Sequence, residues 1–263
     1  MLIFHWKIEI NIRIVEFKSN LVEVHLMRIH KFLAECGVAS RRTSEKLVNE
    51  GRVLVNGTVA KIGQNIDEGK DVVSVDGKVV ERNDKKIYIM LYKPLGVVCT
   101  SSDDKGRKTV IDLIKSDIKE RMFCIGRLDY NTEGLILLTN DGDFSNKVTH
   151  PKNKIAKTYL ARVRGGVVSR EALKQLREGV VLDDGKTAPA KVYIEDIYND
   201  STTLIKITIR EGKNRQIRRM FDAINHPVVD LKRVEVGGIC LGNLPYGKWR
   251  HLTKPEIDKI MKN

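Results

Sequence analysis

The sequence has little cysteine, no long apolar run and no nucleotide-binding loop, and each absence excludes a class of protein. Its four cysteines are scattered, with no Cys-x-x-Cys pair and no histidine at ligand spacing, so we expect no zinc or other metal site. Such cysteines fit a reducing compartment and predict a cytoplasmic protein. No window approaches the roughly 20 apolar residues of a membrane helix. No glycine-rich phosphate loop follows a strand, so nothing calls for ATP or a dinucleotide.

Acidic residues are too few to balance the basic ones. The 263 residues include 47 Lys and Arg against 34 Asp and Glu, which gives a formal net charge of +13. Such a charge favours a polyanion as partner, and nucleic acid is the usual polyanion for a chain with clustered Arg and Lys. Charge alone leaves open a basic protein with no nucleic-acid partner.

Residues 1–26 form an extra N-terminal segment. Apolar and polar residues alternate over 8–14 as in a strand, and charges interrupt the apolar run that a secretory signal needs. Two interpretations remain, a real extra strand or residues translated upstream of the natural start. We favour the second, because Met27 opens the first well-formed helix pattern.

A small domain is predicted for residues 27–84. Apolar residues at helical spacing predict a helix from Arg28 to Gly37, and Ser40 can cap a second helix that Gly51 ends. Two β-hairpins follow, each with the tight turn that Asn-Gly or Asp-Gly favours, at 53–60 and 72–80.

The basic side chains of this domain gather on the helices and the turn after them: Arg28, Lys31, Arg41, Arg42, Lys46 and Arg52. They can form an RNA contact or an ordinary solvated face. The segments 28–34, 37–42 and 51–57 resemble the small RNA-binding domain that is shared with ribosomal small-subunit protein four and is appended to several RNA-modifying enzymes. The resemblance implies that these residues bind RNA.

A second domain is predicted for residues 85–253, after a polar linker and before a C-terminal tail at 254–263. Strands are expected at 87–92, 97–100, 122–125, 135–139, 158–163, 190–197 and 203–209. Helices are expected at 144–148, 170–179 and 215–224. This pattern predicts an α+β fold, a mixed and mainly antiparallel sheet with helices around it, rather than a doubly wound parallel sheet.

The most informative stretch is the glycine-bounded loop 126–134, which lies between two apolar, strand-like runs and carries Asp129. A sheet on either side can aim this carboxylate into a cleft. The spacing alone supports a turn residue equally well. Asp141 and Asp143 follow a strand, where turn chemistry explains them without catalysis.

The second domain resembles the pseudouridine synthases. The resemblance rests on GRLDYNTEGL at 126–135 and on EGKNRQIRRM at 211–220, which narrows it to the ribosomal branch with the module described above. It extends from Met27 to about Thr253. Members of the family convert a uridine in RNA to its C-glycoside isomer, without a cofactor or metal, and the resemblance implies this reaction here in a domain with a central cleft.

The resemblance also implies roles for three residues. Asp129 is the essential aspartate, whether it attacks the sugar or removes a sugar proton. Because burial disfavours a carboxylate, a fixed cation must lie close to it, and Arg218 matches the arginine that pairs with it. Tyr159 matches the tyrosine that stacks on the uracil and whose hydroxyl could help to remove the C5 proton.

The target uridine must be turned out of folded RNA. The resemblance and the loop together predict the residues of the substrate pocket: Arg127, Leu128, Thr132 and Leu231. Basic residues in and next to the segment 211–220 are expected to hold flanking phosphates: Arg210, Lys213, Arg215 and Arg219.

The form of residues 214–219 favours 23S large-subunit ribosomal RNA as partner and substrate, with 16S and transfer RNA as open alternatives. A non-catalytic RNA-binding ribosome assembly factor is a second class of function. The joint presence of Asp129, Tyr159 and Arg218 favours the enzyme, which we expect to be a monomer.

Overall fold

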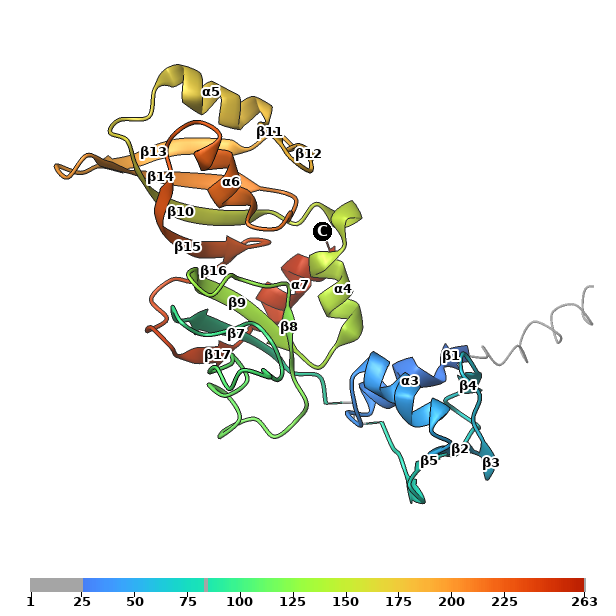
Figure 1. The fold of residues 1–263 in the computed structure, drawn as a ribbon. Coiled ribbons are helices and arrows are strands. Elements are labelled where there is room, and N and C mark those ends of the chain that lie inside the picture. The colour runs from blue at the N-terminus through green and yellow to red at the C-terminus, as the bar shows by residue number, and fades with distance from the viewer. Residues whose placement is uncertain (1–25, 83–84, 263) are drawn as a thin grey trace, which may run out of the picture. The chain divides into compact units, whose positions relative to one another are not determined.

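The structure, a computed structural model, describes residues 26–82 and 85–262. The chain forms two compact units, one on either side of residues 83–84 (Figure 1). Residues 1–25 of the extra N-terminal segment, with the strand expected at 8–14, lie outside the described residues. In the described part, no helix is long and apolar enough to cross a membrane.

The first unit contains the helices and hairpins that the sequence predicts. Its elements are β1 Leu26–Arg28, α2 Ile29–Glu35, α3 Arg41–Asn49, β2 Val53–Val55, β3 Thr58–Val59, β4 Asn65–Asp67, β5 Val73–Val75 and β6 Lys78–Val79. The hairpins form one sheet in the order β3-β2-β5-β6, and β1 pairs with β4. Ser40 caps α3 as expected, because its Oγ accepts a hydrogen bond from the Thr43 N–H at 3.1 Å.

The second unit is built on one large sheet. Its strands are β7 Tyr88–Lys93, β8 Phe123–Ile125, β9 Glu133–Thr139, β10 Lys157–Arg164, β13 Lys191–Ile197, β14 Thr202–Ile209, β15 Val228–Val236, β16 Ile239–Cys240 and β17 Trp249–His251. A small separate hairpin consists of β11 Val181–Leu182 and β12 Gly185–Lys186. The helices are α4 Gly142–Thr149, η1 Pro151–Asn153, α5 Arg170–Glu178, α6 Gln216–Asp222 and α7 Lys254–Lys262.

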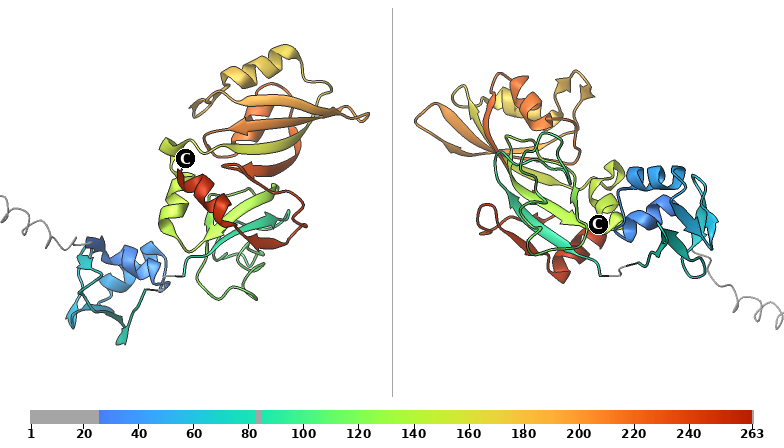
Figure 2. Two further views of the ribbon diagram at one scale, coloured as in Figure 1. Left: turned by 180° about the vertical axis from the view of Figure 1, so that it is seen from behind. Right: turned by 60° about the horizontal axis from the view of Figure 1, so that its bottom comes forward.

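The sheet is mixed and mainly antiparallel, which confirms the predicted fold class. Its strand order is β13-β14-β10-β15-β9-β7-β17, with β16 on β15 and β8 on β9. Alternating side chains feed two cores, one on each face. One core includes α5 and α6, and the other includes α4 and α7; Figure 2 shows α7 against the sheet from behind.

The structure departs from the sequence expectations in three places. The strand expected at 97–100 is wrong, since Val98 makes only an isolated bridge to Thr109. The long strand β15 was not predicted, because a central strand with charged residues lacks a regular apolar alternation. The segment set apart as a tail contains α7, whose Ile260 is fully buried.

A short parallel joint connects the two antiparallel halves of the sheet. Strand β9 meets β15 only through Lys232 opposite Glu133 and Arg233 opposite Gly134. The rest of that edge of β9 pairs with β8, so β8 and β15 part there. Gly134 has φ +111°, and a Cβ on it would lie 2.6 Å from the backbone nitrogen of Arg233. The joint therefore requires glycine at this position.

We predict that Gly134→Ala destabilises the protein by on the order of 3–5 kcal/mol, because strain and a backbone clash add. Thermal unfolding should show a Tm lower by roughly 10 °C or more. Gly106→Ala is the control, since Gly106 also has positive φ, at +67°, but open space around it. It should cost only about 1–2 kcal/mol. Equal losses in the two variants would contradict the close approach of β9 and β15.

Candidate active site

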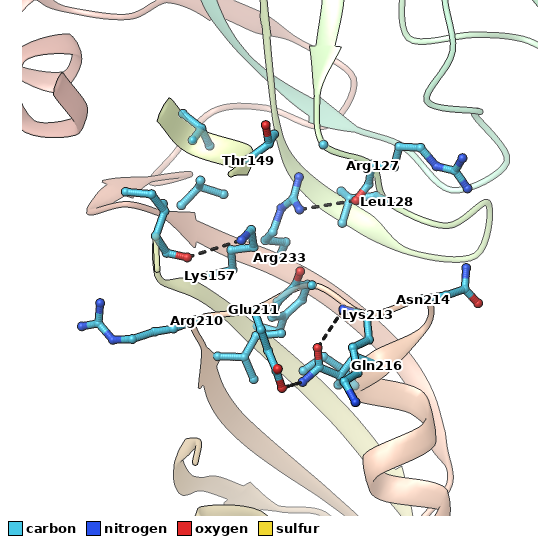
Figure 3. A pocket seen from close by; sticks show the side chains of 18 of the residues that line it. Arg127, Leu128, Thr149, Lys157, Arg210, Glu211, Lys213, Asn214, Gln216 and Arg233 are labelled. Atoms are coloured by element: carbon cyan, nitrogen blue, oxygen red, sulfur yellow. Dashed lines mark hydrogen bonds between the residues drawn. The ribbon is translucent and has the colours of Figure 1, made fainter. Parts of the chain in front are cut away.

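A cleft of about 760 Å³ opens where β8 and β15 separate. Its walls come from the loop 126–132, from β10 and β15, from the loop 209–217 and from the segment around η1. Figure 3 shows that Arg127 and Leu128 lie on one side and Glu211, Lys213 and Gln216 on the other. Elements far apart in the sequence therefore meet around one hollow.

Hydrogen bonds from the core hold the backbone of the loop that carries Asp129. A turn is closed by the Thr132 N–H, which donates to the Asp129 carbonyl at 3.1 Å. The fully buried Lys93 ammonium donates to the carbonyls of Thr132 at 2.8 Å and Pro94 at 2.7 Å. The Leu128 N–H donates to Cys99 Sγ at 3.3 Å. Several parts of the core thus hold the backbone on both sides of the carboxylate.

The Asp129 carboxylate lines the cleft, and its side chain is 31% exposed. Its Oδ2 atom lies 3.9 Å from Nη1 of Arg215. Arg215 was predicted to bind phosphate, and Arg218 was predicted to pair with this aspartate. Within the described residues Asp129 forms an ion pair with Arg215, and the pairing with Arg218 stays a prediction.

The Arg218 side chain forms hydrogen bonds with backbone carbonyl groups in this structure. Its guanidinium donates from Nη2 to the Asn131 carbonyl at 2.6 Å and from Nη1 to the Val228 carbonyl at 3.2 Å. Burial lowers its pKa from the usual value, and the neighbouring Arg215 adds to this shift. Arg215 is the N-cap residue of α6 and has a left-handed backbone conformation (φ +46°), and Arg218 lies in the first turn of the helix. The first reaches the carboxylate, and the second ties α6 to the backbone of the loop.

The other predicted pocket residues take different places. Tyr159 on β10 lines the cleft and is 8% exposed. Leu128, Thr132 and the exposed Arg127 also line the cleft. The Thr132 Oγ1 atom is buried and has no hydrogen-bond partner among the described residues. Leu231 belongs to the same hydrophobic core as Tyr159, pairs with Ala161 in the register of β10 and β15, and is not among the described residues that line the cleft.

Several predicted RNA-binding side chains are already engaged within the protein. Lys213 Nζ donates to the carbonyls of Asp184 and Gly185 at 2.9 and 2.8 Å. Arg219 forms ion pairs with Asp183 and Asp184. These contacts hold the β11–β12 turn against α6 instead of leaving the cations open to phosphate.

In the first unit, Arg52 pairs with Asp76 through two donors, Lys31 pairs with Glu35, and Arg28 donates to the Gly63 carbonyl. The remaining candidates are exposed and make no ion pair within residues 26–82 and 85–262: Arg41, Arg42 and Lys46. The role of these three residues in RNA binding stays a prediction.

Sequence reasoning missed buried polar residues around the loop. No role was predicted for Lys93 at the end of β7 or for Arg233 in β15. Arg233 is only 3% exposed and donates from Nε to the Leu135 carbonyl at 2.7 Å. Lys157 lines the cleft two residues before Tyr159. The one signal in the sequence was that Lys157 shares a strand, and therefore a face, with the predicted tyrosine.

The site offers a carboxyl group, an aromatic ring and several cations around one cleft. In the described part of the chain, no group of three or more His, Cys, Asp or Glu could hold a metal ion. Asp141 has the structural role that its turn position suggested, because its carboxylate caps α4 by accepting from the N–H groups of Asp143 and Phe144. Asp129 is the aspartate among the residues that line the cleft, and Glu211 lies on the opposite wall.

Comparisons with known proteins agree with this geometry. Residues 87–223 match the family described as RNA pseudouridylate synthase, and residues 27–72 match the S4 domain. The chain is 48% identical to ribosomal large subunit pseudouridine synthase B of Bacillus subtilis, over 89% of this chain and 95% of that protein. It is 47% identical to an uncharacterized RNA pseudouridine synthase of Aquifex aeolicus, over 90% and 94% of the two chains. A crystal structure of a pseudouridylate synthase superimposes with a TM-score of 0.65 at 33% identity, covering 89% of this chain and 99% of that one.

We predict that Arg218→Met loosens the loop 126–132, because it removes a charged hydrogen bond to Asn131. The loss of about 1.5–3 kcal/mol should speed amide exchange at Thr132 on the order of tenfold or more. Hydrogen–deuterium exchange measures this without any substrate. Arg219→Met is the control, since it breaks only the pairs with the β11–β12 turn and should leave that amide unchanged. Unaltered exchange in Arg218→Met would show that Arg218 does not hold the loop.

Proposed function

This chain belongs to the RNA pseudouridylate synthase family, and we propose that it converts one uridine of 23S large-subunit ribosomal RNA to pseudouridine. The observation that carries the proposal is the Asp129 carboxylate in a cleft, with Tyr159 in the same cleft and Arg215 at 3.9 Å. The name of the Bacillus subtilis relative supports large-subunit RNA as the substrate. We further propose that the protein acts as a monomer in the cytoplasm.

The reaction is an isomerisation that needs no net oxidation or reduction. The bond between C1′ of the sugar and N1 of uracil breaks, the base turns, and a bond forms between C1′ and C5. The proton on C5 leaves, and N1 gains one. Asp129 acts on the sugar, and Arg215 Nη1 lies 3.9 Å from its carboxylate. The Tyr159 ring packs on the base, and its hydroxyl lies on the route of the C5 proton.

Arg218 enters the proposal as a positioning residue. Its bonds to the carbonyls of Asn131 and Val228 hold the turn that presents Asp129. Its charge also acts on the carboxylate, because Asp129 is among the groups that favour the charged guanidinium. A misplaced carboxylate loses rate steeply, since reacting groups must be held in a near-attack geometry.

RNA reaches the cleft along exposed cations. Arg210 and Arg215 stand on one wall, and Arg127 stands on the other. The exposed Arg41, Arg42 and Lys46 of the first unit are proposed to bind RNA as well, which is the role that its match to the S4 domain suggests. Phosphate contacts of this kind make binding fall with salt.

We predict that Asp129→Asn abolishes pseudouridine formation, lowering kcat on the order of 10⁴-fold or more. Chemical mapping of pseudouridine on ribosomal RNA measures the product. Asp141→Asn is the matched control, because asparagine also caps a helix, and it should keep near-normal activity. Full activity in Asp129→Asn would reject this residue as the catalytic acid.

The substrate is tested by mapping pseudouridine across ribosomal RNA in cells with and without the gene. One site missing from 23S RNA is the expected result. A missing site in 16S RNA would move the proposal to the small subunit, and an unchanged map would favour a non-catalytic RNA-binding assembly factor.

We predict that Arg215→Met lowers kcat/KM roughly 10- to 100-fold, because the carboxylate loses its nearest cation. Arg215→Lys keeps the charge and should recover a large part of the rate. Single-turnover assays at saturating enzyme separate this effect from weaker RNA binding. If both variants lose only affinity and keep the single-turnover rate, then Arg215 serves as a phosphate contact alone.

A further inference from the structure

Two cations deep in the cleft have no role in the steps above. Lys157 and Arg233 both line the cleft, and Figure 3 shows them side by side between the walls. Lys157 projects from β10 and Arg233 from β15, which are neighbouring antiparallel strands. Within the described ranges, neither forms an ion pair with a carboxylate.

The hydrogen bonds that these side chains make are to neutral groups. Arg233 Nε donates to the Leu135 carbonyl at 2.7 Å, and its Nη1 is 3.5 Å from the Arg127 carbonyl. Lys157 Nζ donates to the Ile155 carbonyl at 3.3 Å. Burial and the neighbouring Arg233 lower the pKa of Lys157 from its usual value. Two like charges are thus held together where water is scarce.

The acidic side chains that line the cleft interact with groups other than Lys157 and Arg233. Asp129 pairs with Arg215. Glu211 accepts hydrogen bonds from the Gln216 side chain and from the Ala188 N–H. A buried cation without a partner is costly, so a site that retains two of them is suited to an anion from outside.

The approach to this pair is also basic. Arg210 and Lys154 are exposed at the cleft, and Arg210 Nη1 donates to the Lys154 carbonyl at 3.1 Å. Cations therefore lead from the rim of the cleft toward Lys157 and Arg233. A backbone of linked phosphates fits such a track better than a single small anion does.

We propose that Lys157 and Arg233 form an anion subsite that receives one phosphodiester of the RNA next to the target nucleotide. This rests on the proposed function for the identity of the ligand. Lys157 and Tyr159 lie two residues apart on one strand, a rise of about 6.6 Å, and point to the same face. A nucleotide whose base contacts Tyr159 therefore has its backbone within reach of Lys157. The guanidinium of Arg233 supplies donors in a fixed plane beside it.

The experiment measures the affinity of a twelve-nucleotide oligouridylate for the full-length protein from low to moderate salt. Each phosphate contact to a single strand contributes about 0.7 to the slope of log K against log salt. Lys157→Met should reduce that slope by about 0.7. Lys157→Arg keeps the charge and should restore it.

Lys174→Met is the matched control, because Lys174 is an exposed lysine on α5, paired with Glu178 at 3.8 Å, and should leave the slope unchanged. Lys157→Gln provides a second neutral variant in case Lys157→Met does not fold. Uridine nucleoside, which has no phosphate, is the second probe, and its affinity should be the same in the wild type and in both neutral variants.

Two results would overturn the subsite. An unchanged slope with weaker uridine binding would assign Lys157 to the base, and an oligouridylate that does not bind the wild type would remove RNA as the ligand. These results are independent of the proposed function, which is tested by pseudouridine formation and by the Asp129→Asn variant. Asp129→Asn should bind oligouridylate with the wild-type slope.

Discussion

Two residue pairs between β9 and β15 hold the catalytic half of this molecule together. They join two antiparallel half-sheets in parallel, and only a glycine at position 134 allows the strands to approach so closely. The same joint forces β8 and β15 apart along the edge of β9. The loop with Asp129 starts at the end of β8 and returns into β9, so it lies at this opening. The cleft is therefore a consequence of how the sheet is joined.

Charge in the cleft is distributed unevenly, and the distribution fits RNA chemistry. Asp129 has one arginine at ion-pair distance, while a second arginine holds the backbone of its loop. A buried lysine beneath the loop serves carbonyl groups rather than carboxylates. Within the described residues the cleft therefore holds more cations than carboxylates. The same cations can then both bind RNA phosphates and stabilise the charge of the Asp129 carboxylate.

Other cations have structural tasks. Arg219 and Lys213 hold the β11–β12 turn against α6, and Arg52 holds the Asp76 turn of the first unit. Basic residues of the segment 211–220 thus differ in the parts of the protein that they contact. Their sequence neighbours Arg215 and Arg218 differ from them because they face the loop 126–132 and not the small hairpin.

The sequence by itself determined the local features. Helix caps, Asn-Gly turns and apolar alternation specified the first unit and most strands of the second, because these signals act over a few residues. The loop with Asp129 was evident from its glycines and flanking strands, and the resemblance of its motif marked the acid. Only the tertiary structure decided that Arg215 is the cation beside Asp129, that β15 joins β9, and that Lys157 meets Arg233. Those contacts link segments that are dozens of residues apart, and no local pattern encodes which of several nearby arginines a sheet and a helix will bring to one carboxylate.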